Sequence, residues 1–174
     1  SHFEHEHEMT QKAGVDSHYF FAQSNERLVT PYIKGKNLIF YLRNNKLTIS
    51  QWLQLSLNLA SEIINLHGNG VVHNDITPFN IRVDKLLNVS LIDYGESLND
   101  MSLKAVDIYA YSQILIKKFT LLQKKSPSIN LERIINMLDL CLDKPNQVSL
   151  NNIIEAMQEI HTEPSPYYTL KPQS

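Results

Sequence analysis

A predicted β-hairpin with polar side chains at its base constrains the fold of this chain more than any other feature. Ile81 to Val83 and Val89 to Ile92 are short apolar runs, and turn-forming residues from Asp84 to Asn88 separate them. Apolar runs of this length on either side of a turn are typical of two antiparallel strands. Such a hairpin brings Asn80, just before the first strand, beside Asp93, just after the second.

A third polar residue, Asp75, stands five positions before Asn80, and Asp93 follows Asn80 by thirteen positions. Phosphoryl transfer needs a carboxylate that receives a hydroxyl proton, an amide oxygen that reaches a metal ion, and a second carboxylate that holds the metal on the phosphates. The spacing therefore predicts Asp75 and Asn80 as catalytic residues, and Asn80 and Asp93 as metal ligands.

The triplet His73-Asn74-Asp75, followed by Asn80 and by Asp93-Tyr94-Gly95, resembles the catalytic core of the protein-kinase superfamily. The family's loop reads H-R-D-x-x-x-x-N and its metal motif reads D-F-G. The resemblance implies an α+β fold with a mostly helical large lobe and a partial small lobe that lacks its first strands. It places the partial small lobe in residues 1–33 and the large catalytic lobe in residues 34–174, and it implies ATP and Mg²⁺ as cofactors.

The segment from Arg27 to Gly35 resembles the last strand of the small lobe and the hinge. In the family the hinge backbone binds adenine, which makes Thr30 the gatekeeper and assigns adenine contacts to the carbonyl of Pro31 and the backbone of Ile33. An ordinary edge strand followed by a turn is the alternative interpretation.

Glu6-His7-Glu8-Met9 resembles the Glu-bearing helix of the small lobe, in which Glu6 would pair with the phosphate-binding lysine. Solvent-facing charge is the alternative. The sequence contains neither that strand lysine nor a glycine-rich phosphate loop, because the resemblance begins at the third element of the small lobe. We therefore expect this chain alone to bind nucleotide poorly.

Several residues depart from the family pattern. Arg82 replaces an apolar residue under adenine, so its long side chain would lie flat there or displace the base. Asn74 replaces an arginine that pairs with a phosphate on the activation segment, so we do not expect control by phosphorylation of Ser97 or Ser102. Thr77 stands at the usual position of a lysine that touches the γ-phosphate.

The stretch between Asp93 and Asp107 is short, at 14 positions, and has no Ala-Pro-Glu sequence. This indicates that the platform on which ordinary kinases dock protein substrates is deleted. For Asp107 itself two interpretations remain. It caps the following helix, and, as the family implies, its carboxylate accepts hydrogen bonds from the amides of His73 and Asn74. The two interpretations are compatible with each other.

Apolar periodicity and capping residues predict four helices in the large lobe. Their expected positions are 50 to 67 with Ser50 as the cap and Gly68 and Gly70 at the end, 107 to 122, 131 to 142 with Asn130 as the cap, and 150 to 161 with Ser149 as the cap. The proline-containing end, from Pro164 to Pro172, is expected to be irregular.

Composition excludes some classes of function. A net charge of -2 gives no support for nucleic-acid binding, and no apolar run approaches the ~18 residues that a membrane span requires. The first residues carry no basic, apolar leader, and Cys141 is the only cysteine, so no internal disulfide is possible. These features predict a cytoplasmic protein.

The leading hypothesis is ATP- and Mg-dependent transfer of phosphate to a serine or threonine hydroxyl of a protein. A small-molecule kinase and a pseudokinase that binds a protein partner are the alternatives. The short activation segment and the Asn-, Ile- and Lys-rich composition also resemble shortened kinases that some bacteria inject into host cells, which would place the protein in a host cytosol. The oligomeric state is not predicted.

Overall fold

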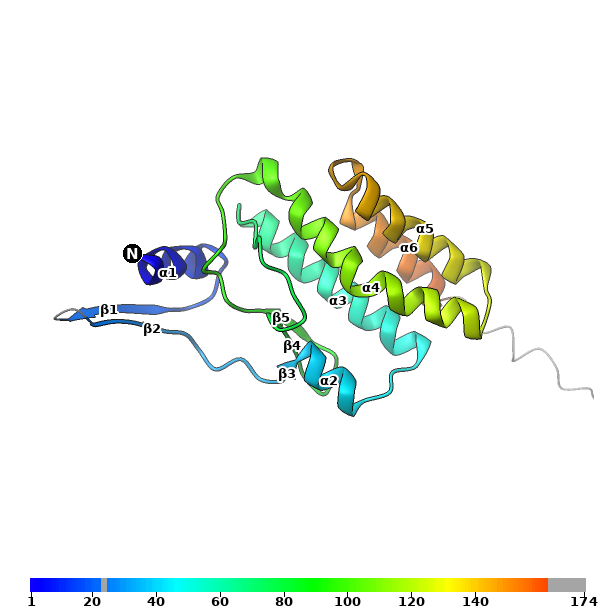
Figure 1. Cartoon of the computed structure of the whole chain (residues 1–174), viewed down its shortest axis with the longest axis horizontal. Helices are drawn as coiled ribbons and strands as arrows, with labels where there is room; N and C mark the ends of the chain where they lie inside the picture. The colour runs from blue at the N-terminus through cyan, green and yellow to red at the C-terminus, as the bar shows by residue number, and fades with distance from the viewer. Residues whose placement is uncertain (23–24, 163–174) are drawn as a thin grey trace, which may run out of the picture.

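The computed structural model describes residues 1–22 and 25–162 and shows an elongated molecule with a small end and a larger helical part (Figure 1). The small end contains one helix and a hairpin, and the helical part contains a second small sheet. The elements in chain order are α1 (His2–Lys12), β1 (His18–Ala22), β2 (Asn25–Val29), β3 (Lys36–Asn37), α2 (Leu38–Asn44), α3 (Ile49–Gly68), β4 (Ile81–Val83), β5 (Val89–Leu91), the 3₁₀ turn Met101–Leu103, α4 (Ala105–Lys125), α5 (Ile129–Asp143), the 3₁₀ turn Pro145–Gln147 and α6 (Leu150–Thr162). The predicted α+β class with mostly helical content is confirmed.

Helix α1 and the β1–β2 hairpin form the small end of the molecule. Ser1 and Glu4 make a reciprocal capping box that starts α1, and β1 pairs with β2 in antiparallel register, with Tyr19 opposite Leu28. Met9 is fully buried in the main core, so α1 is packed against the rest of the molecule. The helix predicted around Glu6 is therefore present. The proposed boundary between residues 33 and 34 stays a prediction.

Helix α3 runs through the centre of the helical part, as Figure 1 shows. Its buried residues include Leu55, Leu59 and Ile63, each at most 1% exposed. Ser50 was predicted as its cap, and this is wrong. Thr48 and Gln51 form a capping box, in which each side chain accepts from the other residue's backbone N–H, and this starts the helix two residues earlier.

Helices α4, α5 and α6 pack with α3 to form the main core. The cap predicted for α5, Asn130, is also wrong, because the Ser128 hydroxyl accepts the hydrogen bond from the Leu131 backbone and the helix begins at Ile129. Helix α6 begins directly after Ser149, as predicted. The proline-containing end beyond residue 162 lies outside the described residues.

The predicted hairpin is confirmed. Strands β4 and β5 are antiparallel with Arg82 opposite Ser90, and β3 adds a third strand by pairing Asn37 with Arg82. The Asp84 carboxylate accepts hydrogen bonds from the backbone of Leu86 and Asn88, which fixes the turn. This sheet lies against α3 and holds the loops on either side of it in place.

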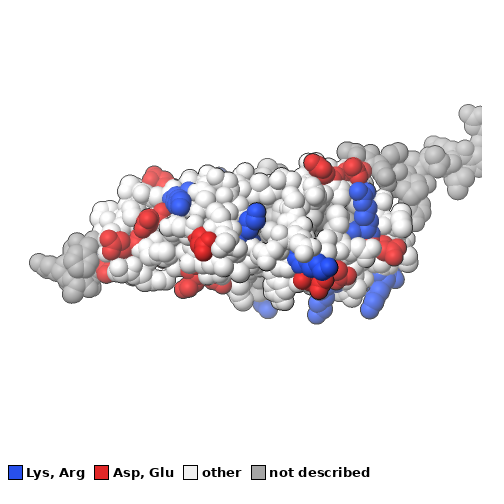
Figure 2. Space-filling model, turned by 90° about the horizontal axis from the view of Figure 1, so that it is seen from above, with Lys and Arg blue, Asp and Glu red and all other residues white. Residues whose placement is uncertain are grey.

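The surface mixes both signs of charge. Figure 2 shows acidic and basic side chains interspersed along the face seen from above, with uncharged residues between them. None of the helices in the described part of the chain is long and apolar enough to cross a bilayer.

Candidate active site

The loop that carries the predicted catalytic residues begins where α3 ends. Val71 and Val72 are fully buried, and Val72 pairs with Leu98 through two backbone hydrogen bonds of 2.9 Å. His73, which follows, is also fully buried. The start of the loop is therefore fixed by the core on one side and by the segment after Asp93 on the other.

Asp107 anchors this loop from α4. Its carboxylate is fully buried and accepts hydrogen bonds from the backbone N–H of His73 at 2.8 Å and of Asn74 at 2.9 Å. A ring nitrogen of His67, in the last turn of α3, lies 2.8 Å from the same carboxylate. Helix α4 begins at Ala105, so Asp107 is not its cap. The interpretation of Asp107 as the anchor of the loop is confirmed, and the cap interpretation is wrong.

The imidazole of His73 connects the two loops. Its Nε2 lies 2.9 Å from the carbonyl of Ile92, which can only accept, so Nε2 carries the proton. Its Nδ1 then accepts from the backbone N–H of Asp75 at 3.3 Å. Burial lowers the pKa of His73 below its usual 6.5, although the Ile92 carbonyl and the carboxylate of Asp107 oppose the shift. His73 is therefore neutral near pH 7 and acts as a structural link.

The lowered pKa of His73 predicts a loss of stability in acid. Below pH 6.5 the unfolded chain binds a proton on this residue that the folded chain does not, so stability falls as the pH falls. The contribution has a slope of at most about 1.4 kcal/mol per pH unit. Urea unfolding between pH 7.5 and 5 should show a steeper decline for the natural chain than for His73→Asn. Parallel pH profiles for the two chains would contradict the assignment.

Asp75 and Asn80 form a bonded pair. The Asn80 amide donates to the Asp75 carboxylate Oδ2 and to the Asp75 carbonyl, both at 2.9 Å. Neither the other Asp75 oxygen, Oδ1, nor Oδ1 of Asn80 has a hydrogen-bond partner among the described residues. One oxygen on each side chain is thus free to face a hydroxyl proton or a metal ion.

Asp93 comes close to this pair through the hairpin. The backbone N–H of Ile92 donates to the carbonyl of Asn80 at 3.0 Å, so the residue before Asp93 is directly paired with Asn80. Asp93 has a φ of 64°, in the left-handed region that non-glycine residues seldom adopt, and its side chain is exposed. The backbone N–H of Gly95 donates to its Oδ1 at 3.3 Å. Backbone strain of this kind is concentrated at functional sites.

Glu6 of α1 approaches Asp93 from the small end. The pKa of Glu6 is raised, mainly by burial and then by the negative charge of Asp93, while His2 opposes the shift. Among the described residues no lysine or arginine forms an ion pair with Glu6. Two carboxylates that repel each other favour a cation between or beside them. The arrangement fits a metal ion or a lysine ammonium group.

A cavity of about 510 Å³ joins most of the predicted site residues. Its lining consists of Glu6, Thr30, Pro31, Tyr32, Ile33, Arg82, Ile92 and Asp93. The structure therefore brings the predicted helix, the predicted hinge and one predicted metal ligand to one place. Asp75 and Asn80 are not part of this lining, although Asn80 is linked to it through Ile92. The size lies within the range of small-molecule sites.

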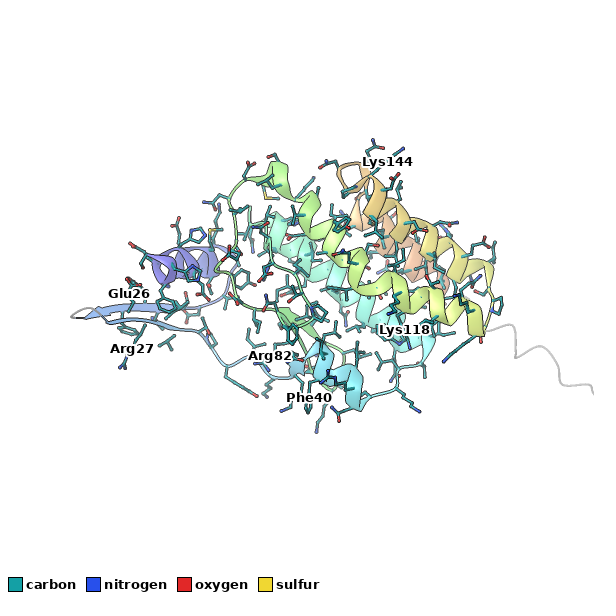
Figure 3. The ribbon with its side chains drawn as sticks, in the orientation of Figure 1. Glu26, Arg27, Phe40, Arg82, Lys118 and Lys144 are labelled. Carbon is teal, nitrogen blue, oxygen red and sulfur yellow. The ribbon has the colours of Figure 1, made fainter. Side chains whose placement is uncertain are left out.

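Arg82 is held at the hinge side of this cavity. Its guanidinium donates to the carbonyl of Gly35 at 3.2 Å, and Figure 3 labels it on β4. Gly35 has a φ of 110°, and a Cβ there would lie 2.4 Å from the carbonyl oxygen of Val83, so only glycine fits. The hinge thus passes directly over β4, and Arg82 ties the two together.

The segment after Asp93 is bonded on both sides. Asn74, with a φ of 65°, donates from its side chain to the carbonyl of Glu96 at 3.1 Å. Ser97 is fully buried and donates to the carbonyl of His73 at 3.1 Å, and Ser102 donates to Asp100 at 2.6 Å. His5 of α1 lies 2.8 Å from the carbonyl of Ser97. Ser97 is therefore a structural residue and is not accessible for phosphorylation.

Sequence reasoning did not identify His67, Ser97 or Tyr32 as part of the site. His67 lies in the last turn of α3, six residues before His73. A histidine at the end of the helix that leads into the catalytic loop was the sequence signal that could have identified it. Ser97 was considered only as a phosphorylation site. Tyr32 is 81% exposed and carries no distinctive motif.

Comparison with known proteins matches residues 5–104 to the family model described as protein tyrosine and serine/threonine kinase. The RGS domain-containing serine/threonine-protein kinase A of Dictyostelium discoideum is 27% identical over 73% of this chain and 14% of its own length. Serine/threonine-protein kinase PrkC of Bacillus subtilis is 33% identical over 39% of this chain and 11% of its own length. A probable inactive serine/threonine-protein kinase of D. discoideum is 37% identical over 43% of this chain and 6% of its length. The chain thus spans a small part of each relative.

Proposed function

The chain belongs to the protein tyrosine and serine/threonine kinase family, and we propose that it transfers the γ-phosphate of ATP to a serine or threonine hydroxyl of a protein. The observation that carries the proposal is the bonded pair of Asp75 and Asn80, held beside the loop of Asp93 by the hairpin. Catalysis of phosphoryl transfer consists mostly of positioning and charge stabilisation, for which this hydrogen-bonded arrangement is suited. Relatives named as serine/threonine kinases support the choice of hydroxyl.

In the proposed reaction Asp75 orients the attacking hydroxyl. Its Oδ1 accepts the hydroxyl proton as the new oxygen–phosphorus bond forms, and the bond to the β-phosphate oxygen breaks with its electron pair on ADP. Asn80 holds Asp75 in place through its amide N–H. The residues that would hold Mg²⁺ are Asn80, through its amide oxygen, and Asp93, through its carboxylate. Bound Mg²⁺ would neutralise charge on the phosphate oxygens.

The cavity between the small end and β4 is the proposed site of the nucleotide. The Pro31 carbonyl and the Ile33 backbone would contact adenine, with Thr30 at its inner edge, while Glu6 and Asp93 lie at the phosphate end. Arg82, bonded to Gly35, would lie along the edge of the base. A protein substrate and a cytoplasmic location are part of the same proposal.

A kinase assay with the product of the complete gene tests this function. The protein is incubated with ATP labelled in the γ-phosphate, Mg²⁺ and a cell lysate, and label is sought on phosphoserine and phosphothreonine. Label on protein hydroxyls supports the proposal. Label on a metabolite alone would show that the substrate is a small molecule. If ATP binds but neither protein nor metabolite is labelled, the chain is a binding module.

A small-molecule acceptor has one specific observation in its favour. The residues between Asp93 and α4 form a short segment that is bonded to the catalytic loop and to α1, with Lys12 donating to Asn99 at 2.8 Å. A segment held in this way leaves little backbone free to bind a peptide. We therefore keep the metabolite acceptor as the second candidate function.

We expect Asp93→Ala to remove the dependence of ATP affinity on Mg²⁺. A carboxylate is a much better ligand for a hard cation than the neutral amide of Asn80. In the natural protein Mg²⁺ should strengthen ATP binding by about tenfold or more, measured by calorimetry with and without the metal. Glu96→Ala, an exposed carboxylate three residues later, is the control. Equal metal dependence in Asp93→Ala and the control would remove Asp93 from the metal site.

A further inference from the structure

A second cavity, of about 640 Å³, lies away from the candidate active site between α2, the start of α3 and the second half of α4. Its lining consists of Leu42, Asn45, Lys46, Leu47, Trp52, Ile114, Lys117, Lys118, Leu121, Leu122 and Lys125. It shares no residue with the cavity that contains Glu6 and Asp93. We call it the basic cavity, because four of these residues are lysines.

The charge around the basic cavity is of one sign. No aspartate or glutamate belongs to its lining, and among the described residues none of the four lysines takes part in an ion pair. The only acidic residue of α4 is Asp107, ten positions before Lys117. Four ammonium groups around one concave site repel each other and raise the local concentration of anions.

Ordinary helix chemistry explains only part of this cluster. Lysines in the last turn of a helix interact favourably with its carbonyl end, which accounts for Lys125. Lys117 and Lys118 lie about two turns before that end, and Lys46 lies on the connection before α3. Lys46 and Lys117 have no such structural reason to be basic, whereas Lys118 lies over the ring of Trp52.

The floor of the basic cavity is apolar and contains the single tryptophan of the chain. Trp52 is 5% exposed, and the ammonium group of Lys118 lies 5.2 Å from its ring centroid. The indole N–H is buried and has no acceptor among the described residues. Figure 3 labels Lys118 on α4. Cations at the rim and aliphatic side chains below them suit a ligand that carries anionic groups on a carbon skeleton.

We propose that the basic cavity binds a polyphosphorylated organic molecule. Several phosphate groups would pair with Lys46, Lys117, Lys118 and Lys125, while the carbon skeleton that bears them would lie over the floor formed by Leu42 and Leu122. This chemistry occurs in free inositol phosphates and in the headgroups of phosphorylated lipids. The site is independent of the proposed catalysis, because it shares no residue with the active site.

Trp52 provides a direct test, because the chain has no other tryptophan. Its fluorescence is followed in the natural chain while inositol 1,4,5-trisphosphate, or the dioctanoyl phosphoinositide with the same headgroup, is added at low ionic strength. A saturable change supports the proposal, and added salt should weaken it. Equal affinity for the two probes indicates a free ligand, and tighter binding of the acylated probe indicates a lipid whose chains contact the floor.

Two matched double variants locate the binding. Lys117→Gln with Lys125→Gln removes two charges from the basic cavity and should weaken binding by about tenfold or more. Lys124→Gln with Lys144→Gln removes two charges outside its lining and should bind as the natural chain does. Lys144 lies far from Lys118 (Figure 3). Neither pair replaces a buried residue, and circular dichroism verifies that both fold.

Two results would overturn the proposal. The first is the absence of a saturable fluorescence change together with the absence of binding heat for both probes. The second is equal weakening of binding by the two double variants, because it would show attraction to general surface charge. Both measurements use binding alone, so a failure of kinase activity would not affect them.

Discussion

Asp75→Asn should lower the rate of phosphoryl transfer by about a hundredfold or more while leaving ATP affinity within about twofold. Asparagine has nearly the same shape, and its amide oxygen can still accept from Asn80 as Asp75 does at 2.9 Å. The variant therefore keeps the loop intact and removes only the group that receives the proton. Nucleotide contacts come from the cavity lining, which does not include Asp75.

Asp139→Asn is the matched control, because Asp139 is an exposed aspartate on α5 with the same chemical change. Both variants of the complete gene product are compared in single-turnover transfer and in ATP titrations. If the natural protein transfers phosphate and Asp75→Asn does so equally fast, Asp75 is not the base. If neither transfers phosphate but both bind ATP, the chain is a binding module.

The centre of the site was predictable from the sequence because its geometry is local. Two apolar runs and the turn from Asp84 to Asn88 determine a hairpin, and a hairpin determines that Asn80 and Ile92 are paired. Apolar periodicity predicted a buried helix that starts at Asp107, but the role of Asp107 as the anchor of the catalytic loop was predictable only through the family resemblance. Hydrogen bonds to the His73 and Asn74 amides join residues 34 and 33 positions apart.

The two incorrectly predicted helix caps show that the type of a single residue does not locate the start of a helix. Ser50 and Asn130 are both good capping residues, yet each stands two positions after another one, Thr48 and Ser128. Thr48 is the cap of α3 because Gln51 completes a capping box with it. The three-residue spacing between Thr48 and Gln51 identifies the cap, whereas the residue type alone does not.

Contacts between distant segments that are not part of the family motif could not be predicted. The link from Arg82 to Gly35 spans 47 positions and that from His5 to Ser97 spans 92. The prediction that Arg82 lies flat under adenine or displaces it considered only the contact between the Arg82 side chain and the base. A backbone carbonyl of the hinge holds the guanidinium, and this carbonyl is available because Gly35 lets the chain pass close to β4.

Asp107→Ala should lower the free energy of unfolding by about 3 kcal/mol or more and abolish phosphoryl transfer. The fully buried carboxylate accepts from two backbone N–H groups and pairs with His67. Alanine leaves these donors buried without an acceptor, and each such donor costs about 1–3 kcal/mol. Urea unfolding of the 174-residue chain measures the loss.

Two comparisons separate this anchor from general destabilisation. Asp107→Asn keeps one acceptor oxygen, so its loss of stability should be smaller than that of Asp107→Ala. Asp100→Ala removes an exposed carboxylate that accepts only from Ser102, and it should leave the loop unaffected. Loss of the loop's position should also expose the backbone N–H groups of His73 and Asn74, which hydrogen exchange detects. If Asp107→Ala unfolds at the same urea concentration as Asp100→Ala and these amides stay protected, the loop is held by its buried neighbours Val72 and His73, and the carboxylate is not its anchor.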